Sequence, residues 1–394
     1  MQIFQNLILV AVAVLPIFVS ARVGDVVPDA YIVVLKEEVT ANDFAAHRAW
    51  ANDVQASSLA KRGDRGHQGL KHTYNMKKLK GYSGTFDKET IAQIKSRADV
   101  AYVEPDRVVE LDAIVSQAGA PWGLGRISSR AKGVSSYYYD DTAGAGVTAY
   151  VIDTGILTTH TQFGGRATWG YNAVSGSSNT DANGHGTHVA GTIGGSTYGV
   201  SKKVSLIAVK VLGDDGSGTN SGVIAGIQWA ASNASGKKAV ANMSLGGTYS
   251  AALNSAVSSA ISSGLTFVVA AGNDNANAAN YSPASVASAI TVGATTSTDA
   301  RSVFSNYGTV LDIFAPGSNI LSSYIGSNSA TASLSGTSMA SPHVAGVVAY
   351  LLGKEALASP AAVAARLTAL ASTGYVTGPG TGSPNRLLYN GSGR

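Results

Sequence analysis

The feature that most constrains the fold is a series of short, almost wholly apolar segments that alternate with helical patterns. Five segments are predicted to be buried strands, at 147–152, 205–211, 239–243, 266–270 and 289–292. Four helices are predicted between or after them, at 185–193, 221–231, 251–262 and 338–352. Strands that lack a polar face need cover on both sides, so we expect an α/β unit in which a parallel sheet has helices on both faces. Functional sites should lie at the carboxyl ends of its strands.

Charge content separates this unit from the region before it. Residues 22–112 contain 14 Lys/Arg and 14 Asp/Glu, whereas residues 113–394 contain 14 and 10. In the first region we predict strands at 30–35, 79–86 and 100–103 (continuing towards Val109), helices at 42–59 and 88–97, and a loop at 61–72. This order is typical of a small α+β domain of the ferredoxin-like type.

The N-terminal residues resemble a secretory signal. An apolar segment interrupted by Pro16 is followed by Val19-Ser20-Ala21, which fits cleavage after Ala21, although the terminal amine is its only positive charge. A membrane anchor is the alternative, but the segment is short and no later stretch is apolar enough to span a bilayer. We therefore expect a secreted protein without a membrane anchor.

Composition limits the remaining classes. The chain has no cysteine, so a secreted form must be stable without disulfides. The net charge is +4 and no long Lys/Arg run is present, so nucleic acid is not an expected partner.

Ser338 is a candidate nucleophile. It lies in Ser333–Gly346 (SLSGTSMASPHVAG), at the start of an apolar helical run. Backbone N–H groups at that position lie near the positive end of the helix dipole, where a developing oxyanion would be stabilised. A serine there is more often a simple helix N-cap. A catalytic role therefore requires a base and an orienting acid elsewhere.

Asp153 and His185 can supply these roles. Asp153 follows the strand at 147–152, where a carboxylate must be hydrogen-bonded and can either orient another group or cap a turn. His185 lies in Asp181–Gly191 (DANGHGTHVAG), where a glycine-rich turn leads into a helix. His188 allows an alternative reading as a metal site, but the motif lacks an acidic partner and no second histidine cluster supports it.

The order Asp153, His185, Ser338 is that of the subtilisin type of serine hydrolase. The segments VIDTGI, HGTHVAG and GTSMASPHVAG resemble the three active-site motifs of the subtilisin-like serine proteases, and the sequence between them is most similar to the proteinase K branch. Further similar segments are Ala120–Ile127, Ser244–Gly247, Ala270–Asn275 and Ser305–Gly317. The start at Ala113-Ile114-Val115 and the lack of cysteine resemble the extracellular cuticle-degrading proteases of nematode-trapping fungi.

The resemblance implies a serine endopeptidase of broad specificity. Ser338 would be the nucleophile, His185 the general base and Asp153 the residue that orients it. Asn273 would donate to the oxyanion together with the Ser338 backbone N–H, although without the resemblance it reads as a turn residue.

The resemblance also implies a substrate site. An extended peptide would bind as an added strand between two segments, Gly216–Asn220 and Ser244–Gly247. The residues expected to bind it there are Gly216, Ser217, Gly218, Ser244, Leu245, Gly246 and Gly247. The absence of side chains at Gly246 and Gly272 would leave room for aromatic or large aliphatic residues at P1. The branch often has tyrosine where this chain has Asn220, so the resemblance does not define the outer hydrophobic pocket of this chain.

The implied maturation divides the chain into a signal peptide (1–21), an inhibitor-type propeptide (22–112) and a peptidase domain (113–394). Val109–Asp112 would lie product-like in the cleft until autocatalytic cleavage before Ala113, so that the propeptide acts as an intramolecular inhibitor of a monomeric enzyme.

No cofactor is implied for catalysis, but a structural Ca²⁺ is. Asp312 matches an acidic calcium ligand of proteinase K relatives, with the carbonyls of Ala287 and Ala289 as companions. The loop departs from the family pattern at Val286 and Ala287.

Two other functional classes make different predictions. A catalytically inactive binding module would have a broken triad, and this triad is complete. A processing protease for basic substrates would need an acidic cleft, but residues 113–394 contain one glutamate, Glu355, and only Asp214 and Asp215 are expected near the cleft. Sequons occur at Asn233, Asn242, Asn280 and Asn390; Asn242 should be buried and unmodified.

Overall fold

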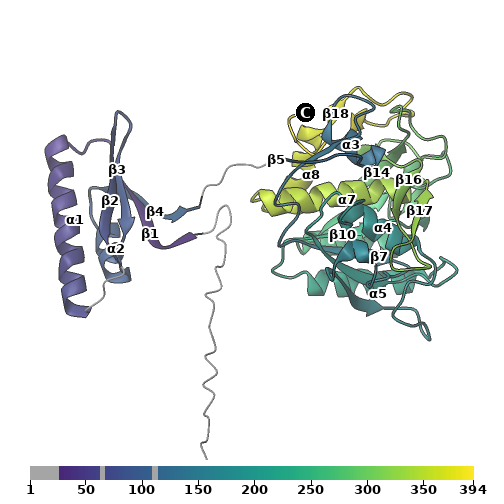
Figure 1. The fold of residues 1–394 in the computed structure, drawn as a ribbon, viewed down its shortest axis with the longest axis horizontal. Helices are drawn as coiled ribbons and strands as arrows, with labels where there is room; N and C mark the ends of the chain where they lie inside the picture. The colour runs from purple at the N-terminus through teal and green to yellow at the C-terminus, as the bar shows by residue number, and fades with distance from the viewer. Residues whose placement is uncertain (1–25, 63–66, 109–113) are drawn as a thin grey trace, which may run out of the picture. The chain divides into compact units, whose positions relative to one another are not determined.

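The computed structural model describes residues 26–62, 67–108 and 114–394. The chain divides into two units, residues 1–111 and 112–394 (Figure 1). Each unit has its own hydrophobic core. The predicted signal peptide and the predicted cleavage site before Ala113 lie outside the described residues. In the described part of the chain, no helix has the length and apolar character needed to cross a membrane.

The first unit is a four-stranded antiparallel sheet in the order β2-β3-β1-β4, with two helices packed against it. Its elements are β1 (Val26–Leu35), α1 (Ala41–Arg62), β2 (Gly69–Met76), β3 (Leu79–Thr85), α2 (Lys88–Lys95) and β4 (Val100–Arg107). The α+β prediction is confirmed, but the loop predicted at 61–72 is wrong because β2 begins at Gly69. β2 is an edge strand with mostly exposed polar residues, so no apolar alternation marks it.

The second unit is built on a nine-stranded sheet in the order β18-β19-β15-β14-β12-β10-β7-β9-β8. Neighbouring strands are parallel except for β18 and β19, which pair antiparallel. The strands are β7 (Thr148–Asp153), β8 (Ala167–Asn172), β9 (Ser205–Lys210), β10 (Ala239–Met243), β12 (Thr266–Ala270), β14 (Ile290–Thr295), β15 (Ile313–Pro316), β18 (Ser372–Thr373) and β19 (Arg386–Leu387).

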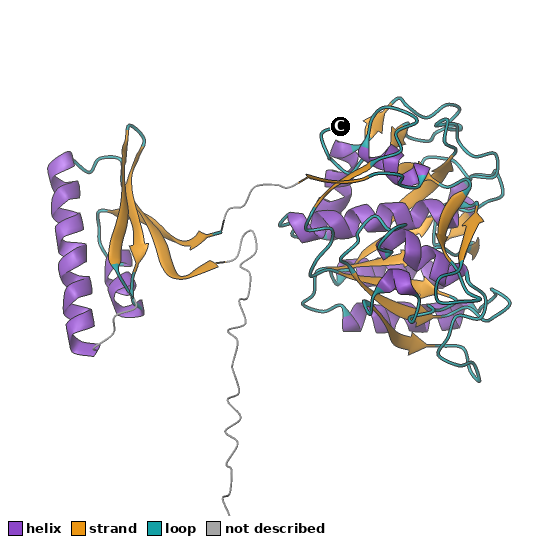
Figure 2. Ribbon diagram, viewed as in Figure 1, coloured by secondary structure: helices purple, strands orange, loops and turns teal. Residues whose placement is uncertain are grey.

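Shorter strand pairs and the helices surround this sheet (Figure 2). The helices are α3 (Trp122–Ser128), α4 (His185–Gly194), α5 (Asn220–Asn233), α6 (Ala251–Ser262), α7 (Thr337–Lys354) and α8 (Pro360–Leu370), with short 3₁₀ turns η1 (Thr161–Phe163) and η2 (Ala278–Asn280). The strand pairs are β5 (Ile114–Gln117) with β6 (Tyr137–Asp140), β11 (Gly247–Thr248) with β13 (Tyr281–Ser282), and β16 (Ile320–Ser323) with β17 (Thr331–Leu334).

The sheet buries both of its faces, as the apolar strands predict. Along β7, Ala149 and Val151 belong to the core that contains α4 and α7, whereas Tyr150 and Ile152 belong to the core that contains α5 and α6. Successive side chains of a strand point to opposite faces, so the two cores lie on opposite sides of the sheet. The predicted α/β fold with helices on both faces is confirmed.

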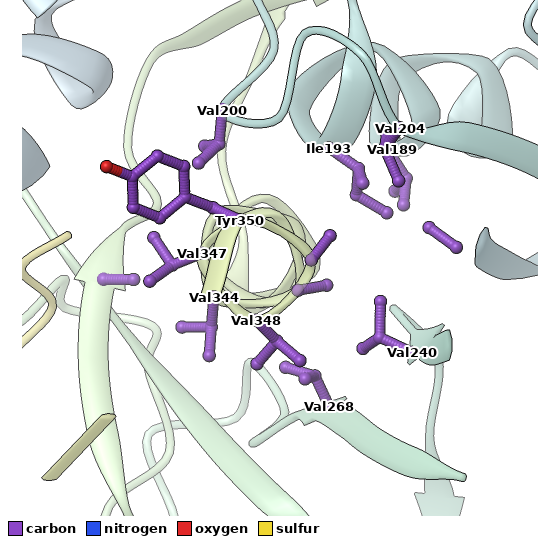
Figure 3. Close-up of a cluster of buried hydrophobic side chains, with 14 of the residues drawn as sticks. Val189, Ile193, Val200, Val204, Val240, Val268, Val344, Val347, Val348 and Tyr350 are labelled. Atoms are coloured by element: carbon purple, nitrogen blue, oxygen red, sulfur yellow. The ribbon is translucent and has the colours of Figure 1, made fainter. Parts of the chain in front are cut away.

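Helix α7 is buried along nearly its whole length. All residues from Met339 to Leu352 are buried. Figure 3 views α7 end-on and shows Val344, Val347 and Val348 directed into surrounding apolar side chains that include Val240 and Val268. Burial of each such side chain contributes about 1.5–3 kcal/mol. The first turn of α7, which carries Ser338, therefore begins on a rigid support.

Candidate active site

Asp153 and His185 form a hydrogen-bonded pair between β7 and α4. Asp153 is the last residue of β7 and is fully buried, and His185 is the first residue of α4. Asp153 Oδ1 lies 2.7 Å from His185 Nδ1 and accepts the Thr154 N–H at 2.7 Å. A carboxylate only accepts, so Nδ1 carries a proton and Nε2 is the basic nitrogen of the neutral ring. In the described part of the chain, Nε2 has no hydrogen-bond partner.

The environment of His185 favours its protonated form. Burial lowers the pKa of the imidazole, but the charge and hydrogen bond of Asp153, together with the charge of Asp181, outweigh it and raise the pKa above its ordinary value of 6.5. The side chain is still 27% exposed. It is therefore a base that is both strengthened and accessible.

Ser338 is the second residue of α7, and its hydroxyl donates to the Ser244 carbonyl at 3.1 Å. Ser244 and His185 line the same cavity. The hydroxyl of Ser338 makes this bond in place of one to His185. Bonds between nucleophile and base are often loose without substrate and tighten in the reactive complex.

A proline in α7 explains how Ser244 holds this serine. Pro342 has no N–H to donate to the Ser338 carbonyl four residues earlier. The Ser244 hydroxyl replaces it and donates to that carbonyl at 2.7 Å. Asn242 Nδ2 donates to Ser244 Oγ at 2.9 Å, and Ser341 Oγ donates to Asn242 Oδ1 at 2.7 Å. The end of β10 thus fixes the start of α7, and Asn242 is 1% exposed, as predicted.

Asn273 lies beside the nucleophile with its amide oxygen already bonded. The backbone N–H and hydroxyl of Thr337 donate to Asn273 Oδ1 at 2.8 and 2.9 Å. The amide nitrogen, Nδ2, has no hydrogen-bond partner among the described residues. The N–H of Ser338 belongs to the first turn of α7, where backbone donors have no acceptor within the helix. Two donors are therefore available next to Ser338 Oγ.

A cavity of about 490 Å³ opens beside His185. It is lined by both predicted substrate segments, Gly216–Asn220 and Ser244–Gly247. Its apolar residues are Leu212, Val223, Leu245 and Leu253. Asn220 begins α5 at its edge, where Thr219 caps the helix.

Gly272 is the predicted substrate residue that does not line this cavity. Its φ is 101°, and an added Cβ would lie 2.3 Å from Asn306 Nδ2. Glycine is therefore required there by the backbone and by contact with Asn306. Its place in the first specificity pocket remains a prediction.

A buried lysine next to the Asp153–His185 pair was not predicted from the sequence. Lys210 has a fully buried side chain and is the register partner of Asp153 in the neighbouring strand. Its ammonium group donates to the Thr154 carbonyl at 2.7 Å and to Asp214 Oδ1 at 3.1 Å. A lysine that ends an otherwise apolar strand was the available signal, because lysine is almost never buried without a partner.

The two histidines of the HxxH motif have different partners. His188 Nε2 lies 2.9 Å from the Ile320 carbonyl and 3.2 Å from the Ala332 carbonyl, whereas His185 pairs with Asp153. Burial lowers the pKa of His188 to about 4. Over residues 26–62, 67–108 and 114–394, no group of three or more His, Cys, Asp and Glu side chains is arranged to hold a metal ion.

Asp312 precedes β15 and carries an uncompensated carboxyl group. Its Oδ2 accepts the Thr291 N–H at 2.8 Å. Burial raises the pKa of Asp312 to about 6, and the Thr291 N–H and the charge of Arg386 only partly oppose this rise. No ion pair to Asp312 is found within the described residues.

Comparison with protein families matches both units. Residues 144–388 match the Subtilase family, and residues 30–112 match the family Peptidase inhibitor I9. The subtilase match covers more than half of the chain, so the chain belongs to the subtilase family.

Fungal proteases are among its relatives. The chain is 51% identical to Subtilisin-like protease 2 of Pseudogymnoascus destructans over 405 residues, with all of both chains covered. It is 54% identical to Alkaline proteinase of Hapsidospora chrysogena over 384 residues, covering 94% of this chain and 93% of the relative. A cold-adapted subtilisin-like serine proteinase of known structure is 52% identical, with a TM-score of 0.66, and the match covers 69% of this chain and 99% of that one. The protein is accordingly a subtilisin-like serine protease with an I9 propeptide.

Proposed function

We propose that Ser338, His185 and Asp153 are the catalytic triad of a broad-specificity endopeptidase. The observation that carries the assignment is the 2.7 Å bond from His185 Nδ1 to Asp153, which leaves Nε2 as the free base at a cavity beside Ser244 and Ser338. The two alternative classes, an inactive binding module and a processing protease for basic substrates, lack such support. A binding module has no use for a strengthened base at an open cavity.

In the proposed mechanism, His185 Nε2 takes the proton of Ser338 Oγ as that oxygen attacks the peptide carbonyl. Asp153 holds the ring in the required tautomer and stabilises the imidazolium that forms. The side-chain N–H of Asn273 and the backbone N–H of Ser338 bind the oxyanion. His185 then protonates the leaving amine, and water hydrolyses the acyl-enzyme by the same steps.

Replacement of the nucleophile tests this assignment. Ser338→Ala should reduce kcat by several orders of magnitude, leaving the roughly 10³–10⁴-fold acceleration that serine proteases keep from their oxyanion site and substrate binding. Hydrolysis of a chromogenic peptide measures the change, and a circular dichroism spectrum checks the fold. Full activity in Ser338→Ala would overturn the triad.

We also propose that the protein is secreted as a zymogen. Residues 1–21 would be removed as a signal peptide, and 22–112 would inhibit the peptidase domain, 113–394, until cleavage before Ala113. The I9 match at 30–112 supports the inhibitor role. N-terminal sequencing of the secreted enzyme should give Ala113, and secreted Ser338→Ala should keep its propeptide. An active mature chain that begins at Arg22 would contradict this scheme.

For substrates we propose extracellular host or nutrient proteins, such as nematode cuticle, with aromatic or large aliphatic P1 residues. The apolar lining of the cavity supports this preference. The acidic residues nearby are already engaged, Asp214 with Lys210 and Asp215 with Ser217, which disfavours dibasic substrates. An aromatic-P1 peptide should be cleaved with a higher kcat/KM than a dibasic peptide. The opposite order would favour the processing protease.

A structural cation at Asp312 is a further proposal. A half-buried carboxyl with no ion-pair partner in the described residues fits one hard, oxygen-ligated cation. The carbonyls of Ala287 and Ala289 would complete the site, and the cation would supply charge compensation only. An unchanged melting temperature in chelator would contradict it.

A further inference from the structure

A second buried carboxylate beside the His185–Asp153 pair has more hydrogen bonds than Asp153 itself. Asp181 is 3% exposed and precedes α4 by four residues. Its Oδ1 accepts from Thr154 Oγ1 at 2.9 Å, Asn183 N at 3.1 Å and Gly184 N at 2.8 Å, and its Oδ2 accepts from Thr187 N at 2.9 Å and Thr187 Oγ1 at 2.6 Å. The described residues place no cationic side chain within ion-pair distance of it.

Through the hydroxyls of Thr154 and Thr187, this carboxylate connects the segment after β7 with the first turn of α4. Each hydroxyl has one proton, which it donates to Asp181, so each can only accept from its other neighbours. Thr154, which follows β7, accepts the Gly186 N–H of α4 at 2.9 Å. Thr187, which belongs to α4, accepts the Leu157 N–H from the segment after β7 at 2.9 Å. Asp181 therefore fastens the end of β7 and the start of α4 to each other.

This connection matters because the end of β7 carries Asp153 and the start of α4 carries His185. Asp153 is the residue before Thr154, and His185 lies two residues before Thr187. Any separation of β7 from α4 at this point would lengthen the 2.7 Å contact of His185 Nδ1 with Asp153 Oδ1. Asp153 itself makes two side-chain hydrogen bonds, both through Oδ1, to His185 and to the Thr154 N–H, whereas Asp181 makes five.

The charge of Asp181 also acts on His185. The carboxylate lies at the N-terminus of α4, where the N–H groups of Gly184 and Thr187 stabilise an anion without a cationic partner. It is one of the groups that raise the pKa of His185. The other charged or titratable groups near His185 are Asp153, His188 in the next turn of α4, and the Lys210 ammonium bonded to the Thr154 carbonyl.

We propose that Asp181 is a positioning residue of the hydrolytic site, which holds Asp153 and His185 at bonding distance through Thr154 and Thr187. The proposal rests on the triad assigned above. Asp181 itself does not line the substrate cavity, although its partners Thr154 and Asn183 do, so its main effect should fall on the chemical step and a smaller one on KM.

Asp181→Asn is the direct test, measured on the mature enzyme. The amide nitrogen would face the N–H and O–H of Thr187, which breaks one half of the connection and removes the charge. We expect kcat to fall roughly tenfold to hundredfold with a much smaller change in KM, as for other displaced catalytic groups. The acid limb of the kcat/KM profile should move to lower pH because the negative charge that favours the imidazolium is gone.

Asp299→Asn is the matched control for loss of a buried carboxylate. Asp299 is also fully buried, but it pairs with Arg126 at 2.8 and 3.1 Å away from the cavity. This variant should lower the melting temperature without moving kcat or the pH profile. If Asp181→Asn behaves in the same way, Asp181 is only structural and the proposal is wrong.

Thr187 provides a second route if Asp181→Asn fails to fold. Thr187→Val keeps the shape but removes the hydroxyl that joins Asp181 to Leu157, whereas Thr187→Ser keeps the hydroxyl. We expect Thr187→Val to lower kcat and Thr187→Ser to restore it. Equal kcat in the two variants would overturn the proposal.

A serine-reactive fluorophosphonate separates this result from a failure of the triad itself. Labelling counts the folded active sites in each preparation, so kcat is expressed per labelled site. Labelling of the wild type but not of Ser338→Ala supports the triad independently of Asp181. A normal kcat per labelled site in Asp181→Asn contradicts the positioning role alone.

Discussion

The two units of this chain each contain a His–Asp pair with nearly the same geometry. In the first unit, His47 Nδ1 lies 2.8 Å from Asp99 Oδ2, and in the second, His185 Nδ1 lies 2.7 Å from Asp153 Oδ1. Their surroundings have opposite effects. Burial lowers the pKa of His47, whereas the pKa of His185 is raised. A short His–Asp contact is therefore not sufficient for a catalytic base.

The second ring nitrogen makes the difference. His47 Nε2 lies 3.0 Å from the Tyr82 hydroxyl, and the side chain of His47 is fully buried. Its partner Asp99 is shared with the guanidinium of Arg97 at 2.8 and 2.9 Å. The His47 pair is thus a closed structural network, whereas Nε2 of His185 has no partner in the described chain and adjoins the cavity.

The largest effect on kcat is expected when the His185–Asp153 pair loses its carboxylate. Asp153→Asn should lower kcat by about 10⁴-fold, because an amide favours the wrong tautomer of His185 while leaving the site in place. Asp99→Asn in the propeptide should leave kcat of the mature enzyme unchanged. Peptide hydrolysis by both variants tests the comparison. A loss below tenfold in Asp153→Asn would mean that the two pairs differ less than their surroundings indicate.

A smaller loss is expected at the donor beside Ser338. Asn273→Ala should lower kcat by roughly 10²–10³-fold with little change in KM, because Nδ2 would bind charge that develops only in the transition state. Asn277→Ala is the control in the same loop, since Asn277 caps η2 and has no contact with Thr337. Similar kinetic losses in the two variants would show that loop integrity, and not the donor, matters.

The His47–Asp99 pair should affect the stability of the first unit and not the rate of peptide hydrolysis. The folded state lowers the pKa of His47, so the unfolded state binds more protons below pH 6.5 and stability is lost as pH falls. The slope is at most about 1.4 kcal/mol per pH unit for one proton. Calorimetry of uncleaved Ser338→Ala from pH 7.5 to 5 should show the first unit melting earlier at acid pH. His47→Gln should remove most of this dependence; an unchanged slope would assign it to other groups.

Asp312 extends the comparison to a half-buried carboxyl that has neither histidine nor arginine bonded to it. Its pKa is raised to about 6, so the stability that the neutral form provides is present below the ordinary value of 3.8 and lost as pH rises through 6. The variant is made in the inactive Ser338→Ala protein. In chelator at pH 8, Asp312→Asn should therefore raise the free energy of unfolding of that protein by on the order of 1 kcal/mol. Excess Ca²⁺ should reverse the order in thermal melts. No reversal would exclude a cation at Asp312.

Strong local patterns made most of the second unit predictable. The strands at 239–243 and 266–270 and the helix at 251–262 match the structure residue for residue, because continuous apolar runs and clear helix caps mark them. The edge strand β2 was missed since its exposed polar residues show no apolar periodicity. The edge strand β8 was also missed, although Ala167, Trp169 and Tyr171 alternate with small or polar residues along it. The helix α8 was also not predicted.

The candidate site was predictable as a set of residues but not as an arrangement. Motif order was enough to select Asp153, His185 and Ser338. The roles of Asp181 and Lys210 depend on contacts between strands and helices distant in sequence, and a single sequence does not contain those distances. The hydrogen bond from Ser244 to the Ser338 carbonyl was likewise not predicted. The sequence indicates only that this carbonyl needs another donor, because Pro342 lacks an N–H.

The enclosure of α7 has a consequence for how the enzyme loses activity. Ser338 lies in the first turn of a helix whose residues from Met339 to Leu352 are all buried, so the nucleophile cannot be displaced by fraying of a surface segment. The backbone amides of Val344 to Leu352, which lie inside the buried part of this helix, should exchange hydrogen through global opening of residues 114–394. Heat inactivation should then follow the same single transition as the loss of tertiary structure, with no partly folded inactive form before it.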